Sequence, residues 1–403
     1  MRDLFRKRRM WSRRPELKSN YDVVIIGGGS HGLATAYYLR ELGITDVAIL
    51  EKGYIGSGAA GRNTTIIRSN YKTPEGARFY DASVKLYEKL GQDLNFNLLF
   101  SQCGHLTLAH TDRALFVMAN RAEVNRLHGI DSQLIDPDQV KELAPTMHVG
   151  SDATYPVLGA LYHPPGGIIR HDAVVWGYAR GASEGGAEIH QYTEVTGFER
   201  SGDRITGVKT NRGKVTANTV LNCTAGWSSL ISEMAGIELP ITTHILQACV
   251  TEPVKPFLDV VIVSSQMHVY LSQSDRGEFV MGSEIEPWTT YRTANTLNFL
   301  QDLTRHALEL FPQMEHARLL RAWAGLCDLS PDYSPILGKT EVENFHVSAG
   351  WGTYGFKAAP IVGKTLAELV ATDRTPDLIA PFELERFYKD ELVSELAAAA
   401  VSH

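Results

Sequence analysis

The chain has 403 residues, of which 44% are apolar and 21% charged, a composition typical of a globular protein with room for two cores. No stretch approaches the roughly 18 consecutive apolar residues of a membrane span, so we expect no membrane insertion. Residues 1–20 carry eight basic and two acidic side chains, a net charge of +6, which leaves −13 on the rest. We interpret them as a solvated basic arm, with a subunit contact as the alternative, and the acidic body argues against nucleic-acid binding.

Four cysteines, Cys103, Cys223, Cys249 and Cys327, lie far apart and form no Cys-x-x-Cys pair. This spacing favours free thiols in a reducing cytoplasm and predicts no zinc-type metal site. No apolar run follows the basic arm, which therefore lacks the pattern of a secretion signal. We expect a cytoplasmic protein without a bound metal.

The clearest motif begins with an apolar, β-branched strand at residues 23–26, followed by Gly27, Gly29 and Gly32 in the spacing Gly-x-Gly-x-x-Gly. In a dinucleotide-binding unit the first glycine allows a tight turn and the second lets a pyrophosphate approach the backbone. The third lets the following helix pack closely against the strand. A helix is predicted at residues 33–42, and its N-terminal amides would face the phosphates.

A second apolar strand is predicted at residues 47–50 and ends at Glu51, 24 residues after the first glycine of the motif. A carboxylate there can accept hydrogen bonds from ribose hydroxyls, which favours FAD or NAD over NADP. Strand, glycines, helix, strand and acid occur in the required order, so the sequence predicts a nucleotide site.

The segments that follow favour FAD over NAD. Residues 53–71, "GYIGSGAAGRNTTIIRSNY", are rich in glycine and small polar residues that could wrap a pyrophosphate and reach a flavin ring. Two more strand-to-glycine turns follow, and a helix predicted at residues 358–370 would stabilise negative charge on a reduced flavin. The glycines of these turns are Gly226, Gly350, Gly352 and Gly355. Three separated turns of this kind indicate one long cofactor across the edge of a parallel sheet.

Several blocks carry a resemblance to a known family: "GGGSHGLATAYYLRELGI", "GRNTTIIRSNY", "CGHLTLAHTD", "GGIIRHDAVVWGYA", "VYLSQSDRGEFVMG" and "AGWGTYGFKAAP". The chain resembles, over residues 20–390, the amine-oxidising flavoproteins of the D-amino-acid oxidase and sarcosine oxidase superfamily. The closer resemblance is to the beta subunits of heterotetrameric sarcosine oxidases. The glycine motif is shared by the whole superfamily, whereas the second and fourth blocks are much more specific.

The resemblance implies an α/β (α+β) fold, in which a Rossmann-like FAD-binding domain is interleaved with an antiparallel-sheet substrate domain. The FAD-binding domain would take residues 21–100, 165–235 and 325–390, and the substrate domain residues 101–164 and 236–324. The sequence agrees, because "DVVIVSSQMHVYLSQSDRGEFVMGSEI" alternates as strands do and "NTLNFLQDLTRHALELF" repeats apolar residues at helical spacing.

The resemblance also implies a reaction. Members of the family oxidise sarcosine (N-methylglycine) to glycine and a one-carbon unit, which is released as formaldehyde or passed to tetrahydrofolate on a partner subunit. A hydride leaves the N-methyl group for N5 of FAD, electrons pass to FMN, and oxygen is reduced to hydrogen peroxide. The beta subunit carries this FMN covalently on a histidine at its interface with the alpha subunit, in an assembly with gamma and delta subunits.

Arg68 and Lys357 are the expected catalytic residues, because arginine binds a carboxylate bidentately and Lys357 follows the C-terminal glycine turn. Two cations would also favour the neutral, reactive form of the substrate amine. The alternatives are a phosphate contact or a surface charge for the arginine and a charge at a helix start for the lysine. The residues expected around FAD are Gly27, Gly29, Ser30, His31, Gly32, Glu51, Lys52, Arg62, Asn63, Thr64, Thr65, Gly226, Gly352, Gly355 and Lys357.

His171 lies between Arg170 and Asp172, where a helix is predicted to begin with Asp172 as its cap. From the local chemistry, a solvent-facing or capping role is the ordinary interpretation. A helix N-terminus lowers the pKa of an imidazolium and so favours the neutral ring that a covalent flavin link requires. The resemblance implies that His171 carries FMN, with Arg170 near it.

Two positions depart from the single-chain sarcosine oxidases. Their flavin-linking cysteine corresponds to Gly325, with Cys327 two residues away, and their oxygen-activating lysine has no counterpart in "GEFVMGS". Non-covalent FAD would follow, with oxygen reduced at a second flavin or avoided by a dehydrogenase. The alternative functions are oxidation of another secondary amine (dimethylglycine, proline or an opine) and electron transfer by a subunit that oxidises no amine.

Overall fold

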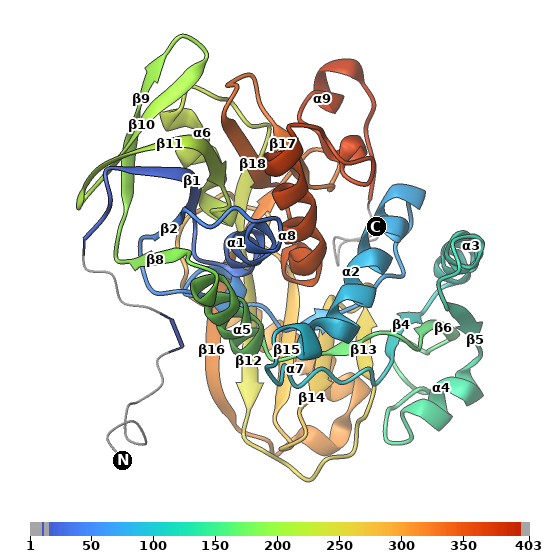
Figure 1. Ribbon diagram of the computed structural model, residues 1–403. Coiled ribbons are helices and arrows are strands. Elements are labelled where there is room, and N and C mark those ends of the chain that lie inside the picture. The colour runs from blue at the N-terminus through green and yellow to red at the C-terminus, as the bar shows by residue number, and fades with distance from the viewer. Residues whose placement is uncertain (1–9, 12–15, 396–403) are drawn as a thin grey trace.

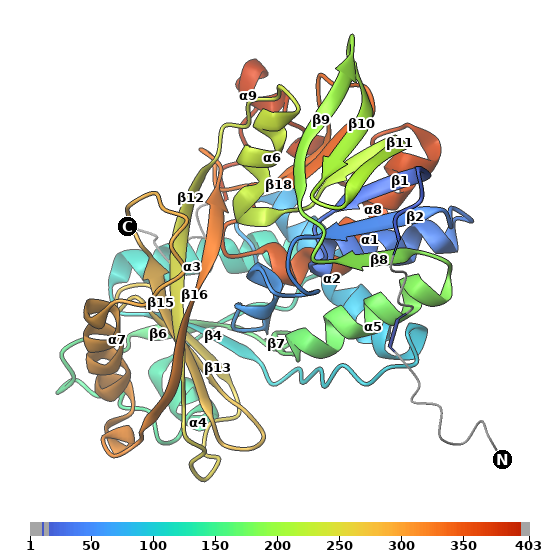
Figure 2. The ribbon, with the colours of Figure 1, turned by 90° about the vertical axis from the view of Figure 1, so that its left-hand side faces the viewer.

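The structure is a computed structural model that describes residues 10–11 and 16–395. It contains two large sheets, with helices packed around and between them (Figures 1 and 2). Most of the basic arm lies outside the described residues, but Lys18 binds the body of the protein through ion pairs with Asp46 at 2.7 Å and Glu188 at 3.1 Å. Within the described ranges, the structure contains no helix long and apolar enough to cross a membrane.

The first sheet has the strand order β17-β18-β11-β1-β2-β8, and the hairpin β9–β10 extends from β11. Neighbouring strands from β18 to β8 run parallel, and β17 pairs antiparallel with β18. The carboxyl end of β1 is a topological switch point, since the chain builds β2 on one side of it and β11 on the other. The strands are β1 (Asn20–Ile26), β2 (Val47–Glu51), β8 (Glu188–Gln191), β9 (Val195–Ser201), β10 (Arg204–Thr210), β11 (Gly213–Asn222), β17 (Ile336–Lys339) and β18 (Phe345–Ala349).

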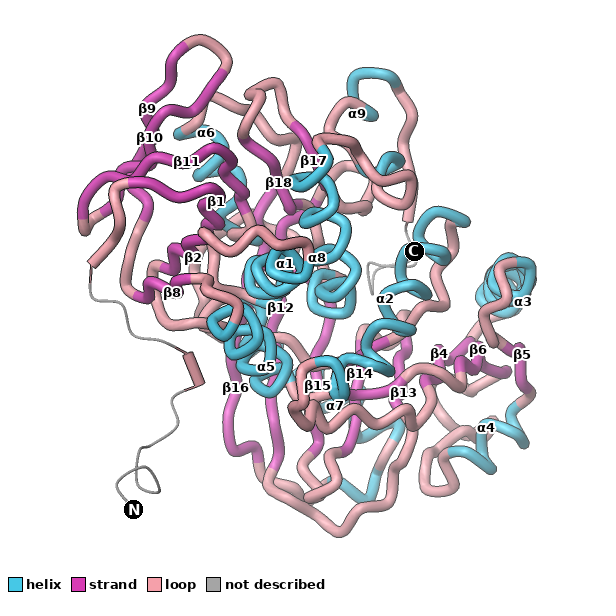
Figure 3. The backbone as a smooth tube through the Cα atoms, in the orientation of Figure 1, coloured by secondary structure: helices cyan, strands magenta, loops and turns pink. Residues whose placement is uncertain are grey.

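Helices cover one face of this sheet and enclose the largest apolar core, which is built around α1, α2, α5 and α8. The other face packs in a smaller core with β9, β10 and α6. Figure 3 shows the helices grouped beside the strands of this layer. The helices are α1 (Ser30–Glu41), α2 (Pro74–Asp93), α5 (His171–Glu184), α6 (Ser228–Met234), α8 (Gly355–Thr372) and α9 (Arg386–Lys389), with short 3-10 turns at Ala59–Gly61, Ala225–Trp227 and Ala380–Phe382.

The second sheet is mainly antiparallel, with the order β16-β12-β15-β14-β13-β4-β6-β5, and α7 packs into its core (Figure 2). A small antiparallel pair, β3 (Ile66–Ile67) and β7 (Gly167–Ile168), lies in the connection between the layers. The other elements are β4 (His105–Ala109), β5 (Gln133–Ile135), β6 (Gly159–His163), β12 (Thr242–Thr251), β13 (Val261–Ser264), β14 (Val269–Gln273), β15 (Phe279–Ile285), β16 (Leu319–Leu329), α3 (Asp112–Leu127), α4 (Pro137–Leu143), α7 (Leu297–Leu310) and the turn Pro312–Met314.

The predicted fold class is confirmed: a Rossmann-like sheet is interleaved with an antiparallel sheet. The boundary expected at residue 325 falls inside β16, which belongs to the antiparallel sheet along its whole length. Both helices that follow glycine turns begin three residues earlier than predicted, at Ser30 and Gly355. Because glycine is a weak helix former, the sequence pattern predicts helix starts after the glycines. In the structure, packing holds the earlier residues in the first helical turns.

The helix α5 also begins earlier than predicted, and the expected cap is wrong. Arg170 occupies the N-cap position and supplies no side-chain cap, while Asp172 is the second helical residue. The Asp172 carboxylate accepts hydrogen bonds from the Arg170 guanidinium at 2.7 Å and from the amide of Ala173 at 2.9 Å. The aspartate therefore holds the arginine against the first turn of the helix.

Candidate active site

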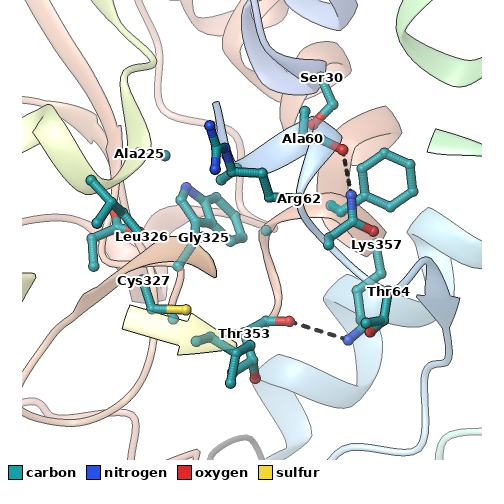
Figure 4. Close-up of a pocket in the computed structure, with 18 of the residues that line it drawn as sticks. Ser30, Ala60, Arg62, Thr64, Ala225, Gly325, Leu326, Cys327, Thr353 and Lys357 are labelled. Carbon is teal, nitrogen blue, oxygen red and sulfur yellow. Dashed lines mark hydrogen bonds between the residues drawn. The ribbon is translucent and has the colours of Figure 1, made fainter. Parts of the chain in front are cut away.

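A cavity of about 1170 Å³ lies between the two sheets, at the carboxyl ends of β1, β2 and β11. Its walls come from the turn after β1, the segment after β2, the first turns of α1 and α8, and the strand β16. Figure 4 shows Ser30 and Ala60 on one side of this space and Gly325, Leu326 and Cys327 of β16 on another. The cavity thus occupies the switch point at which open α/β sheets bind their ligands.

Two helices begin at this cavity without a capping side chain. The helix α1 follows Gly29 and α8 follows Tyr354, and neither cap residue offers a side-chain acceptor to the first amides. By contrast, Thr73, Thr111 and Thr296 cap α2, α3 and α7 with their hydroxyls. Uncapped N–H groups and the positive ends of the two helices would bind an anionic ligand such as a pyrophosphate.

The glycines of the turns divide into two kinds. Gly27, Gly29, Gly352 and Gly355 line the cavity. An added Cβ at Gly29 would have its nearest neighbour at 3.9 Å, so packing does not require this glycine and the free space is on the ligand side. Gly32 and Gly226, which we had placed at the cofactor, do not line the cavity. A Cβ at Gly32 would lie 2.1 Å from the carbonyl oxygen of Gly27, and a Cβ at Gly226 would lie 2.5 Å from a side-chain carbon of β16. Both glycines therefore allow close packing.

Glu51 and Lys52 line the end of the cavity expected to hold the nucleotide. The Glu51 carboxylate accepts hydrogen bonds from the amides of Gly28 at 2.8 Å and Gly53 at 2.7 Å, which fixes its position beside the glycine turn. Each carboxylate oxygen retains capacity to accept from a ribose hydroxyl. The Lys52 ammonium lies 3.6 Å from the centre of the Trp227 ring, another lining residue.

The segment after β2 reaches across the cavity to the antiparallel sheet. Arg62 donates to the carbonyl of Ala324 at 2.9 Å, and its own carbonyl accepts from the Trp323 indole at 2.8 Å. Asn63 accepts from the amide of Thr65 at 2.7 Å and donates to the carbonyl of Ala60. Thr65 has a φ of +63°, a strained conformation for a β-branched residue and one that persists mainly at functional sites. These lining residues also include Thr64.

His31 of α1 lines the cavity and forms hydrogen bonds with residues of β18 and α8. Its Nε2–H donates to the carbonyl of Gly355 at 2.6 Å, and its Nδ1 accepts from the Ser348 hydroxyl at 3.0 Å. Ser348 in turn accepts from the Trp351 indole at 2.9 Å. Burial lowers the pKa of His31 to about 4, so the ring is neutral at neutral pH. His31 therefore holds the first turns of α1 and α8 in register.

Arg68 and Lys357 line the same cavity, and their side chains are only 9% and 8% exposed. Arg68 donates to Asn70 Oδ1 at 3.0 Å and stacks 4.5 Å above the Tyr71 ring. Lys357 has one long hydrogen bond, 3.4 Å, to the carbonyl of Thr353 (Figure 4). Burial, and then the charge of Arg68, hold the pKa of Lys357 well below its usual value. An anion bound between the two cations would restore the charged lysine.

The structure adds lining residues that the sequence did not identify, among them His105, Arg121, Tyr270 and Asp328. Burial raises the pKa of Asp328 to about 7, and its carboxylate accepts from the amide of Gly350 at 2.6 Å. The strand pattern could have placed His105 on one face of β4, but no sequence signal says which face meets a cavity. Over the described part of the chain, no group of three or more His, Cys, Asp or Glu residues is arranged to hold a metal ion.

His171 and Arg170 do not line this cavity. His171 is the first residue of α5 and is half-buried. Burial lowers the pKa of His171, an effect that Asp172 opposes and Arg170 reinforces. The imidazole is therefore neutral at neutral pH, at a position separate from the site that holds Arg68 and Lys357.

Comparison with known proteins agrees with this geometry. The family model of FAD-dependent oxidoreductases (DAO) matches residues 22–369. The chain is 47% identical to the sarcosine oxidase subunit beta of Arthrobacter sp over 98% of this chain and 97% of that protein. It is 45% identical to the protein of the same name from Rhodobacter capsulatus, over 96% and 94%. Among solved structures, L-proline dehydrogenase from P. horikoshii has a TM-score of 0.88 at 31% identity, over 94% of this chain and 100% of that one.

The residues around the cavity fit FAD. The uncapped helix starts, the open space at Gly29 and the carboxylate of Glu51 suit a pyrophosphate and a ribose, and two buried cations lie beyond them. The family match covers both sheets and the whole cavity wall. The chain therefore belongs to the DAO family of FAD-dependent oxidoreductases and is a homologue of the sarcosine oxidase beta subunits.

Proposed function

We propose that this chain is the sarcosine-oxidising subunit of a multi-subunit flavoenzyme of sarcosine catabolism. It converts N-methylglycine to glycine and a one-carbon unit, either formaldehyde or methylenetetrahydrofolate. The observation that carries the proposal is that two buried cations, Arg68 and Lys357, line the same cavity as the dinucleotide turn. The identity of 47% to a sarcosine oxidase beta subunit supports sarcosine as the substrate.

Arg68 and Lys357 bind the substrate carboxylate and thereby orient the amine. Asn70 and Tyr71 hold the guanidinium in place, so little side-chain freedom is lost when it binds a carboxylate. The positive charge also lowers the pKa of the substrate ammonium, and only the free amine can release a hydride. When bound, FAD accepts the hydride that leaves the N-methyl carbon.

The FAD is non-covalent in this proposal. The resemblance implies that Gly325 occupies the position of the linking cysteine in the single-chain sarcosine oxidases, and Cys327 lines the same wall two residues along β16 (Figure 4). Burial raises the pKa of the Cys327 thiol, which therefore stays protonated, whereas a covalent link would require the thiolate. These features support binding through the backbone turns alone.

His171 carries a second flavin, FMN, in this proposal, with Arg170 beside it. Two features support this role: the neutral imidazole and a position outside the FAD cavity. A partner alpha subunit would cover this FMN in an assembly with gamma and delta subunits, and a partner would hold tetrahydrofolate. Oxygen would be reduced at the second flavin to hydrogen peroxide. The four free cysteines are in keeping with the cytoplasm as the place of this reaction.

Two experiments test the proposal. Anaerobic addition of sarcosine to the flavin-loaded enzyme should reduce the flavin and so bleach its visible absorbance. Absence of bleaching would exclude amine oxidation by this chain. Mass measurement of the denatured chain tests the covalent flavin. We expect one FMN mass on the wild-type chain and none on His171→Ala, and a wild-type chain that releases all its flavin would refute the link.

A second candidate substrate is proline, or another secondary amine such as dimethylglycine or an opine. The 31% identity to the structure of an L-proline dehydrogenase favours including it, since the same two cations would bind the carboxylate of any of these amino acids. Parallel anaerobic titrations with sarcosine, proline and dimethylglycine would rank them by rate of flavin reduction. A subunit limited to electron transfer would be reduced by none of them.

A further inference from the structure

Arg121 of α3 is a buried cation at the substrate end of the cavity that the proposed reaction does not use. It is 8% exposed and lines the cavity. Its Nε donates to the carbonyl of Asn70, but in the part of the chain that the structure describes its buried Nη2 has no hydrogen-bond partner. Burial, and then the charge of Arg68, lower its pKa to about 9, which leaves the guanidinium charged at neutral pH. A buried charge with an unsatisfied donor is costly unless an anion binds it.

No acid of the described chain takes up that donor. Glu395 is the carboxylate whose charge acts on Arg121, but its oxygens accept from the amides of Lys72 and Thr73 and from the Thr73 hydroxyl. Of the cavity's lining acids, Glu51 lies beside the glycine turn, and Asp328 accepts from the Gly350 amide. Arg121 thus lines the cavity with a buried Nη2 that has no acceptor among the described residues.

His105 of β4 has the same character. It is 1% exposed, it lines the cavity, and both of its ring nitrogens are buried without a partner among the described residues. Its cross-strand neighbour His163 is fully engaged, since it accepts from the amide of Ser69 at 3.2 Å and donates to the carbonyl of Asp131 at 2.7 Å. Burial and the charge of Arg68 keep His105 neutral, so its ring offers one unused N–H donor.

The two pairs of side chains come from different layers. Arg68 follows β3 and Lys357 lies in the first turn of α8, whereas His105 belongs to β4 of the antiparallel sheet and Arg121 to α3, which packs against that sheet. The Arg121 guanidinium is charged, and Glu395, the acid whose charge acts on it, is already hydrogen-bonded to the amides of Lys72 and Thr73. Arg121 and His105 line the same cavity as the carboxylate clamp, and each has buried nitrogen atoms without a hydrogen-bond partner among the described residues.

We propose that Arg121 and His105 form a second anion subsite, so that the cavity takes secondary-amine amino acids whose N-substituent carries a further carboxylate. The first carboxylate binds Arg68 and Lys357, and the second binds Arg121 and the N–H of His105. This subsite rests on the proposed function, because it assumes that the first clamp holds an amino-acid carboxylate. Among the secondary amines named above, it favours opine-like N-carboxyalkyl amino acids, and it assigns the residues that would bind their second carboxylate.

The test compares two unreactive thioethers that differ by one carboxylate, (methylthio)acetate and thiodiacetate. Calorimetry on the flavin-loaded full chain at constant ionic strength gives the two dissociation constants. We expect thiodiacetate to bind at least about tenfold more tightly, since a hydrogen bond to a charged group supports a factor of this order. Arg121→Gln should reduce the ratio of the two affinities by about tenfold or more. His105→Phe, which keeps a ring and removes both nitrogens, should reduce it by a smaller factor.

Asn125 provides a matched control one turn further along α3. Its side chain donates to the carbonyl of Tyr71 at 2.6 Å, much as Arg121 donates to Asn70, but it does not line the cavity. Asn125→Ala should leave the affinity ratio within twofold of wild type. The subsite is refuted if wild type binds both thioethers equally, or if Asn125→Ala changes the ratio as much as Arg121→Gln does.

A parallel anaerobic titration with sarcosine separates the two proposals. Flavin reduction by sarcosine together with equal binding of the two thioethers refutes the subsite alone. Absence of flavin reduction by sarcosine, with no binding of (methylthio)acetate, refutes the carboxylate clamp on which the subsite rests.

Discussion

Arg68→Gln gives the sharpest test of the carboxylate clamp. Asn70 and Tyr71 hold the Arg68 guanidinium in a buried position, so the arginine is oriented before substrate arrives. Glutamine removes the charge and the bidentate donor pair, and each hydrogen bond to a charged group contributes about 1.5–3 kcal/mol. Two such bonds amount to about 3–6 kcal/mol, which corresponds to a loss of about 10²- to 10⁴-fold in kcat/KM for sarcosine.

The magnitude for Arg68→Lys is smaller, because lysine keeps the charge and loses the planar fork and its stacking on Tyr71. We expect a loss of about tenfold to hundredfold. Both variants should retain FAD, since Arg68 contacts Asn70 and Tyr71, whereas Glu51 is held by the amides of Gly28 and Gly53 at the glycine turn. Removing the arginine charge should also raise the pKa of Lys357, which Arg68 helps to depress.

Anaerobic stopped-flow measurements of flavin reduction give the substrate dissociation constant and the limiting rate separately, and the absorbance spectrum gives the FAD content. Arg113→Gln is the matched control, because Arg113 also lines the cavity but is exposed, and its loss should change kcat/KM by less than about threefold. Unchanged kinetics in Arg68→Gln would refute the clamp. Loss of FAD from that variant would instead assign the arginine to the cofactor.

Three further predictions concern the scaffold of the site. Gly32→Ala should lower the thermal midpoint, because the new methyl group would lie 2.1 Å from a carbonyl oxygen. Gly29→Ala should keep the thermal midpoint but weaken FAD binding. Thermal melting and flavin titration of the two variants measure these effects. Asp328→Asn should stabilise the apoprotein by an amount that grows by about 3 kcal/mol from pH 5 to pH 8. The reason is that burial raises the folded-state pKa of this carboxyl to about 7, so wild type loses stability as the pH rises through that range, and pH-independent denaturation differences would contradict this. Asp332→Ala leaves the buried Arg386 without its bidentate partner at 2.8 and 2.9 Å and should cost about 3–5 kcal/mol in urea unfolding, while a loss below about 1 kcal/mol would refute that role.

The sequence predicted secondary structure and turn motifs correctly where residues close together in the chain determine them. The strand–glycine–helix unit, the acid at the end of β2 and the helix α7 all follow from residue periodicity and turn spacing over a few dozen residues. The interleaved fold class came from the resemblance, and it is confirmed by the two sheets and by the family match. The end points of helices were less predictable, as Arg170 and Asp172 show, because one residue of shift changes which side chain is the cap.

The sequence by itself determined that the chain has a dinucleotide turn, a Rossmann-like core and a set of polar residues suited to a flavin. Only the tertiary structure decided which of these residues share a cavity. Gly29 and Gly32 belong to one motif, yet one borders the ligand space and the other packs against backbone. Arg121 and His105 carry no local signal, since their unsatisfied donors exist only because α3 and β4 fold against a distant loop. Contacts within a turn are encoded by spacing along the chain, whereas burial and the loss of hydrogen-bond partners arise when distant segments meet.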